Sequence, residues 1–124
     1  MKTTYTVLRA DGTKETGEVD WPEQPEFGQI KAFVTPLIPS LTGVGPDGKP
    51  LPRFAWHEHV AVLWEGERRD MFVDEHFIEK RLPFNEEATK VYRNNWLTMH
   101  PDADPETLPP IHGDAVIFGR RVWF

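Results

Sequence analysis

The chain has 124 residues, a formal net charge of -6 and no cysteine. This length fits one domain, which we expect over residues 1–124, and no stretch approaches the roughly 20 apolar residues of a membrane-spanning helix. The lack of cysteine excludes disulfides, thiolate metal sites and cysteine nucleophiles. The negative charge argues against nucleic-acid binding. Without a signal segment at the N-terminus, we expect a cytoplasmic location.

The first third of the chain predicts a hairpin followed by a helix. Residues 3–10 are rich in β-branched and aromatic side chains, Asp11-Gly12 is a two-residue turn signal, and residues 13–19 return as a polar strand. We expect this polar strand at an exposed edge of a sheet. Apolar residues then recur at helical spacing from Pro25-Glu26 onward, and Pro36 and Pro39 are expected to end the helix.

The middle of the chain predicts a loop and a second hairpin. Residues 38–55 are rich in glycine and proline and show no periodicity. Residues 57–64 form the clearest strand, and its two apolar faces predict a central position in the sheet. The tight turn Glu65-Gly66 leads into a returning strand over residues 67–74.

The last third predicts a helix and a final strand. Asn85 is a good N-cap, followed by two glutamates that favour a helix N-terminus, and the helix is expected to end near Leu97. Residues 114–118 form an apolar strand. The predicted order is β-β-α-β-β-α-β, a small α+β fold with a mostly antiparallel sheet and two helices packed on one face.

Two segments in the second half carry a family resemblance. They are Leu82-Pro83-Phe84-Asn85-Glu86-Glu87-Ala88-Thr89 at the helix start and Ile111-His112-Gly113-Asp114-Ala115-Val116-Ile117-Phe118-Gly119 at the final strand. The pattern resembles a family of small uncharacterised domains of phages, plasmids and bacterial mobile elements. These domains share a Leu-Pro-x-Asn-x-x-Ala-Thr helix start and a late Gly-Asp-Ala/Val strand. The resemblance spans about residues 27–119 and is specific over 60–119. The chain departs from the family pattern in the proline-rich loop over residues 38–55 and in an acidic insert before Ile111.

The resemblance implies a genetic context and brings no catalytic residue with it. The motif residues also have a structural interpretation, in which Asn85 caps a helix and Ala88 lets that helix approach the sheet. In the same interpretation Gly113-Asp114 turns into the last strand, and Gly119 permits a bulge or a positive φ.

A histidine pair beside a carboxylate is the candidate metal site. Alternation along a strand puts His57 and His59 on one face. If Glu65-Gly66 is a two-residue turn, His59 opposes Phe72 and His57 opposes Asp74. Two imidazoles and one carboxylate are a ligand set for iron or zinc. The alternative is that the histidines lie at the solvent end of the strand, paired with Asp74.

An acidic stretch and several tryptophans are candidate partner-binding features. Residues 94–119 contain no lysine or arginine but include Asp102, Asp104, Glu106 and Asp114, which form either an acidic face or a solvated loop. Trp64 and Trp96 fit core positions. Three further tryptophans at element ends are candidate anchors for a partner, namely Trp21, Trp56 and Trp123.

These features together predict a non-enzymatic protein-binding or accessory protein of phage or mobile-element type. It would bind an unidentified protein and modulate a host defence or DNA-processing protein, with a homodimer as a further option and no cofactor. The alternative is a small metal-dependent enzyme that uses His57, His59 and Asp74. The sequence contains no Gly-x-Ser-x-Gly elbow and no glycine-rich phosphate loop that would support other chemistry.

Overall fold

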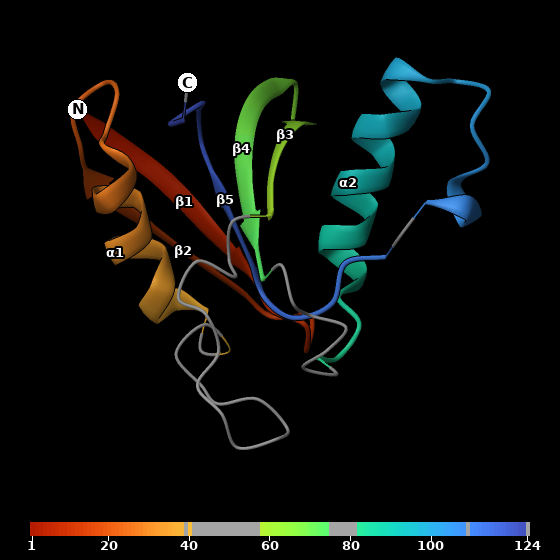
Figure 1. The fold of residues 1–124 in the computed structure, drawn as a ribbon, viewed down its shortest axis with the longest axis horizontal. Coiled ribbons are helices and arrows are strands. Elements are labelled where there is room, and N and C mark those ends of the chain that lie inside the picture. Colours follow the sequence, from red (N-terminus) through yellow and green to blue (C-terminus); the bar gives the residue numbers. More distant parts are fainter. Residues whose placement is uncertain (39, 41–57, 75–81, 109, 124) are drawn as a thin grey trace.

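The computed structural model describes residues 1–38, 40, 58–74, 82–108 and 110–123. Its elements follow the predicted order β-β-α-β-β-α-β, which confirms the α+β fold (Figure 1). In chain order they are β1 (Lys2–Leu8), β2 (Lys14–Asp20), α1 (Phe27–Leu37), β3 (Glu58–Trp64), β4 (Glu67–Val73), α2 (Glu86–Met99), a 3-10 turn (Pro105–Thr107) and β5 (Ala115–Phe118).

The five strands form one antiparallel sheet in the order β2-β1-β5-β4-β3. The polar strand β2 lies at an exposed edge, as predicted. The prediction that β3 is central was wrong, because β3 is the other edge and β1, β5 and β4 occupy the interior. Every residue of β5 is buried, which is the stronger signature of a central strand.

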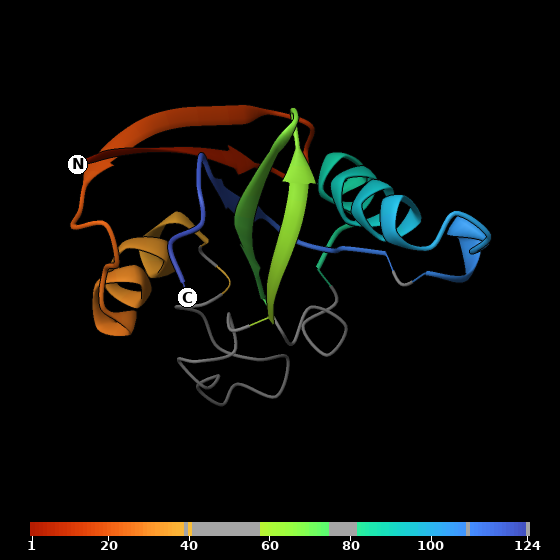
Figure 2. The same ribbon diagram turned by 90° about the horizontal axis from the view of Figure 1, so that it is seen from above.

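The two helices cover opposite faces of the sheet, which corrects the expectation that both pack on one face (Figure 2). Ile30 and Val34 of α1 share a core cluster with Phe72, whereas Ala88 and Val91 of α2 share a second cluster with the neighbouring residue, Met71. Adjacent residues of a strand point to opposite faces. The interior strands are apolar on both faces, and each face therefore needs its own covering helix.

The turns show where local sequence signals were sufficient. Glu65 and Gly66 have φ angles of 53° and 79°, which is the two-residue turn expected from the sequence. The Asp11-Gly12 turn is wider than predicted, because Arg9 N donates to Thr13 O over 2.9 Å and leaves three residues between them. No helix in the described part of the chain is long and apolar enough to cross a membrane.

Candidate functional site

The two segments that carry the family resemblance pack against each other. Gly113 N donates to Pro83 O over 2.7 Å, and Asn85 N donates to Ile111 O over 2.9 Å. Ile111 N donates in turn to Thr89 Oγ1 over 2.8 Å. We call these contacts the motif junction, and we include in it the end of β1, which the Asn85 side chain contacts. It joins the start of α2 to the start of β5.

Asn85 is the centre of the motif junction and is fully buried. Its Oδ1 accepts a hydrogen bond from Ala88 N over 3.1 Å, which confirms the predicted N-cap. Its Nδ2 donates to Leu8 O and to Gly113 O, each over 2.8 Å. One side chain therefore caps a helix and also ties β1 to the turn before β5.

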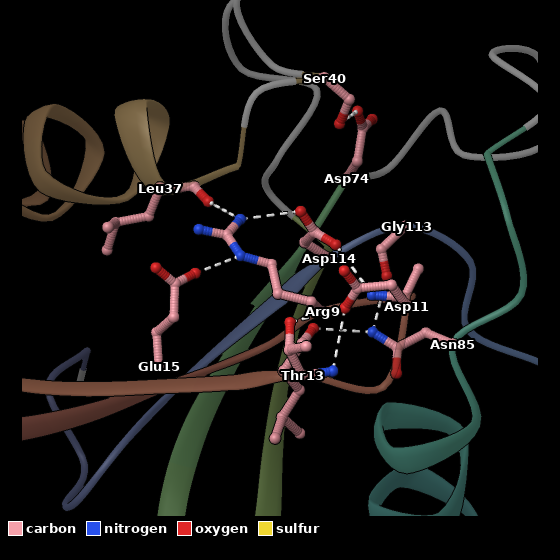
Figure 3. A network of polar contacts seen from close by, with 12 residues as sticks. Arg9, Asp11, Thr13, Glu15, Leu37, Ser40, Asp74, Asn85, Gly113 and Asp114 are labelled. Carbon is pink, nitrogen blue, oxygen red and sulfur yellow. Dashed lines mark hydrogen bonds and ion pairs between the residues drawn. The ribbon is translucent and has the colours of Figure 1, made fainter.

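Arg9, directly after β1, and Asp114, directly before β5, extend the junction (Figure 3). Arg9 Nη1 donates to Asp114 Oδ2 over 2.8 Å and to Leu37 O over 2.6 Å, while Arg9 Nε donates to the Glu15 carboxylate. Ala10 N donates to Asp114 Oδ1 over 2.9 Å. Burial lowers the pKa of Arg9, but the hydrogen bonds to Asp114 and Glu15 outweigh it and raise that pKa above its ordinary value.

The structural interpretation of the motif is confirmed at Asn85, which caps α2, and at Gly113, which lies in the turn before β5. Gly113 has a φ of 80°, which glycine tolerates best, in the turn before β5. Gly119 does not have the positive φ that was one of its expected roles. A Cβ at Gly119 would collide with Thr4 Oγ1, so this glycine instead allows close approach of β1 and the residue after β5. Asp114 is paired with Arg9 and contributes no free charge to the acidic stretch.

The candidate metal site is only partly within the described residues. His59 pairs with Phe72, which confirms the predicted register, and the structure describes only the backbone of His59. His57 lies outside the described residues. Asp74 is fully buried, and its Oδ2 accepts a hydrogen bond from Ser40 Oγ over 2.7 Å. The described ranges contain no group of three metal-ligating residues, and the three-ligand hypothesis stays a prediction.

The candidate tryptophan anchors differ in their exposure. Trp21 is only 6% exposed and packs against Phe33 and Phe118, with ring centroids 5.3 Å and 5.2 Å away. The expectation of a partly exposed Trp21 was therefore wrong, because its indole fills the space between α1 and the sheet. Trp123 is 37% exposed. Trp56 lies outside the described residues.

The end of α2 presents apolar side chains to solvent. Trp96 is 38% exposed and Met99 is 66% exposed, so the prediction of a core Trp96 was wrong. Residues four apart share one side of a helix, and Met99 is one turn beyond Asn95, which bonds to β3. The sheet therefore does not cover the last turn of α2. The Trp96 ring lies against His100, with centroids 4.5 Å apart.

Three exposed carboxylates follow directly after α2, namely Asp102, Asp104 and Glu106. We call them the acidic segment. None of the three makes an ion pair with any described residue. Asp104 also has a local role, because its Oδ1 accepts from Glu106 N over 3.0 Å at the start of the 3-10 turn.

The acidic segment is held close to the apolar end of α2. Ala103 N donates to His100 O over 3.0 Å, and Arg93 Nη2 donates to Leu108 O over 3.1 Å. Trp96, Met99 and the acidic segment follow one another along the chain and are all exposed, and together we call them the α2 surface. The sequence analysis identified the negative charge of this surface but predicted a core position for Trp96.

No protein-family model, curated protein or solved structure matches this chain. The resemblance to mobile-element domains therefore stays a prediction that rests on the two motif segments. The motif junction is a set of hydrogen bonds that stabilises the packing of α2, β1 and β5. The α2 surface instead combines exposed apolar side chains with carboxylates that pair with no cation in the described part of the chain, which suits binding of a partner.

Proposed function

We propose that this chain is a non-enzymatic protein-binding module whose α2 surface docks a segment of another protein. The observation that supports this function is the exposed pair Trp96 and Met99 beside carboxylates that have no ion-pair partner among the described residues. Exposed tryptophan and methionine are favoured at protein interfaces because they bury much apolar area with adaptable contacts.

The charge of the α2 surface defines the kind of partner. A segment with apolar side chains flanked by lysine or arginine would bury Trp96 and Met99 and pair with Asp102 and Glu106. The contact with His100 restricts the Trp96 ring before binding, which reduces the entropy lost on association. Exposed ion pairs are screened by salt, so the apolar contacts supply most of the affinity and the carboxylates supply selectivity.

Calorimetry with two synthetic peptides tests the proposal. One peptide alternates leucine with lysine or arginine, and its counterpart carries glutamate instead. We expect binding of the basic peptide only, with affinity reduced about 10- to 30-fold by Trp96→Ala, as for an interface hot spot. Trp123→Ala is the matched control, since Trp123 has a similar exposure of 37%. Equal losses in both variants, or no binding of the basic peptide, would contradict the proposal.

The acidic contribution is tested separately. The double variant Asp102→Asn with Glu106→Gln should lower the affinity for the basic peptide and reduce the salt dependence of its binding. Asp104 is kept because it caps the 3-10 turn. The narrower role, modulation of a host defence or DNA-processing protein, is supported by the resemblance and by the acidic segment. Titrating such an enzyme with wild type and with the double variant tests it, and inhibition by both to the same extent would contradict it.

A metal-dependent enzyme that uses His57, His59 and Asp74 is the second candidate. The register favours it, because it ends with the pair Glu58 and Val73, and in the sequence His57 precedes Glu58 and Asp74 follows Val73. Elemental analysis of protein purified without a histidine tag discriminates the candidates. Stoichiometric metal that is lost in His57→Ala would favour the enzyme. Metal-free protein that stays folded would rule it out, whereas turnover by the purified chain would overturn the binding module.

A further inference from the structure

Arg93, about one turn before Trp96 on α2, carries a buried hydrogen-bond donor that meets no acceptor in the described part of the chain. This donor is Nε, and among the described residues no other buried side-chain nitrogen or oxygen is without a hydrogen-bond partner. A buried donor that makes no hydrogen bond costs stability, so its presence needs a physical explanation. The guanidinium also forms no ion pair with a described carboxylate.

The other partly buried arginines whose contacts are described do not share this feature. Each of them places its Nε on an oxygen atom of the protein, namely Arg9, Arg69, Arg120 and Arg121. The guanidinium of Arg93 makes one hydrogen bond to a described residue, from Nη2 to Leu108 O over 3.1 Å. Because a guanidinium has five N–H donors, most of the binding capacity of Arg93 is not used within the described ranges.

The carboxylates next to α2 do not act as acceptors for Arg93. Asp102, Asp104 and Glu106 are exposed, and none of them forms an ion pair with Arg93. Asp104 is engaged locally, since its Oδ1 accepts a hydrogen bond from Glu106 N. Residues three apart lie on the same side of a helix, so this guanidinium and Trp96 share one side of α2. A cation in this position suits an anionic group brought by another molecule.

We infer that Arg93 binds a carboxylate of the segment that docks on the α2 surface, so this partner carries an acidic residue as well as basic ones. The inference rests on the proposed function of the α2 surface. A carboxylate accepts two parallel bonds from Nε and Nη2, and such charge-assisted bonds are about twice as strong as neutral ones. The carboxylate reaches Nε through a shift of the guanidinium, which gives up at most the one bond to the neutral carbonyl of Leu108.

The burial of Nε favours this pairing. In the free chain this donor is already out of contact with water and makes no hydrogen bond to a described residue. A carboxylate that bonds to it therefore adds a hydrogen bond without a new desolvation cost for the donor. We expect the carboxylate to strengthen binding about tenfold or more, which is the effect of one charge-assisted hydrogen bond. Lysine lacks the planar fork that a bidentate pair requires.

Calorimetry of the full chain with matched peptides tests the inference. In the peptide of leucine with lysine or arginine, each basic position in turn is replaced by glutamate or, as the control, by glutamine. At one position the glutamate peptide should bind wild type about tenfold more tightly than the glutamine peptide. Arg93→Lys should abolish this difference and still bind both peptides. Arg68→Lys, the same change at an exposed arginine of β4, should keep the difference.

Acetate alone tests the Arg93 site without a peptide. In NMR spectra of wild type, the Nε–H resonance of Arg93 should shift saturably as sodium acetate is added. Sodium chloride at the same ionic strength is the control, and it should cause no such shift. A saturable shift with inorganic phosphate but not with acetate would overturn the assignment to a carboxylate.

The outcomes separate this inference from the proposed function. If wild type binds the glutamate and glutamine peptides equally at every position, and Trp96→Ala weakens both, the inference is wrong and the proposed function stands. If none of the peptides binds, both are wrong. An Arg93 Nε–H resonance that does not respond to acetate would overturn the inference, whatever the peptides do.

Discussion

Replacing Asn85 with aspartate separates its two roles. Aspartate and asparagine are nearly equivalent at an ordinary N-cap, because only a side-chain oxygen is needed. Asn85→Asp keeps the acceptor for Ala88 N. It removes the donor that bonds Leu8 O and Gly113 O, and it turns a carboxylate oxygen toward two carbonyl oxygens that were each 2.8 Å from the nitrogen.

The expected loss of stability follows from the burial of these groups. Asn85 is 0% exposed, so water cannot replace the lost donors. Losing the Asn85 hydrogen bonds to two buried carbonyls costs about 1–3 kcal/mol each, and the carboxylate buried beside them adds to this. We expect Asn85→Asp to lower the free energy of unfolding by about 3–5 kcal/mol, a large part of the total for a small domain.

Urea unfolding followed by tryptophan fluorescence and circular dichroism measures this loss. With a slope of about 2 kcal/mol per molar urea, the midpoint should fall by about 2 M. Burial without a donor raises the pKa of the new carboxyl, so the deficit should shrink as the pH falls toward about 4, because the protonated carboxyl regains a donor. Asn94→Asp, an exposed site on the same helix, should change stability by no more than about 0.5 kcal/mol. An Asn85→Asp variant as stable as that control would refute the reasoning.

Three further predictions test other contacts. Asp11 has its pKa lowered by hydrogen bonds from the Thr13 hydroxyl and backbone, so its stabilisation is present above about pH 4 and is lost as the pH falls through the lowered pKa. Thr13→Val should raise the Asp11 pKa in an NMR titration, and an unchanged value would argue against the hydroxyl. The fully buried carboxylate of Asp70 accepts from a guanidinium and two backbone N–H groups after β5, so Asp70→Asn should cost about 2–4 kcal/mol in urea unfolding. Gly119→Ala should lower the melting temperature, because its Cβ would clash with the Thr4 hydroxyl. Adding Thr4→Ala should recover most of the loss, and no recovery would contradict the clash.

Local interactions made much of the fold predictable. The Glu65-Gly66 turn and the register of β3 on β4 follow from residues that are neighbours in the chain. The start of α2 follows from Asn85 and the glutamates after it. The element order is predictable for the same reason, because alternation and helical spacing are properties of short segments.

The candidate sites were less predictable, because exposure depends on what lies next to a side chain. Trp21 at a strand end and Trp96 on an amphipathic helix give no local sign that the first is buried and the second is exposed. The acidic segment was recognisable from composition alone. Its lack of ion-pair partners in the described ranges depends on how those ranges pack together.

By itself, the sequence determined the α+β class, the order of the elements and the cap of α2, since each depends on residues a few positions apart. Only the tertiary structure decided that the helices cover opposite faces and that β3 is an edge. It also decided that Arg9 pairs with Asp114, 105 positions away, and that Asn95 bonds to the backbone of β3. These contacts join distant segments, and distance along the chain carries no information about which segments meet in the folded core.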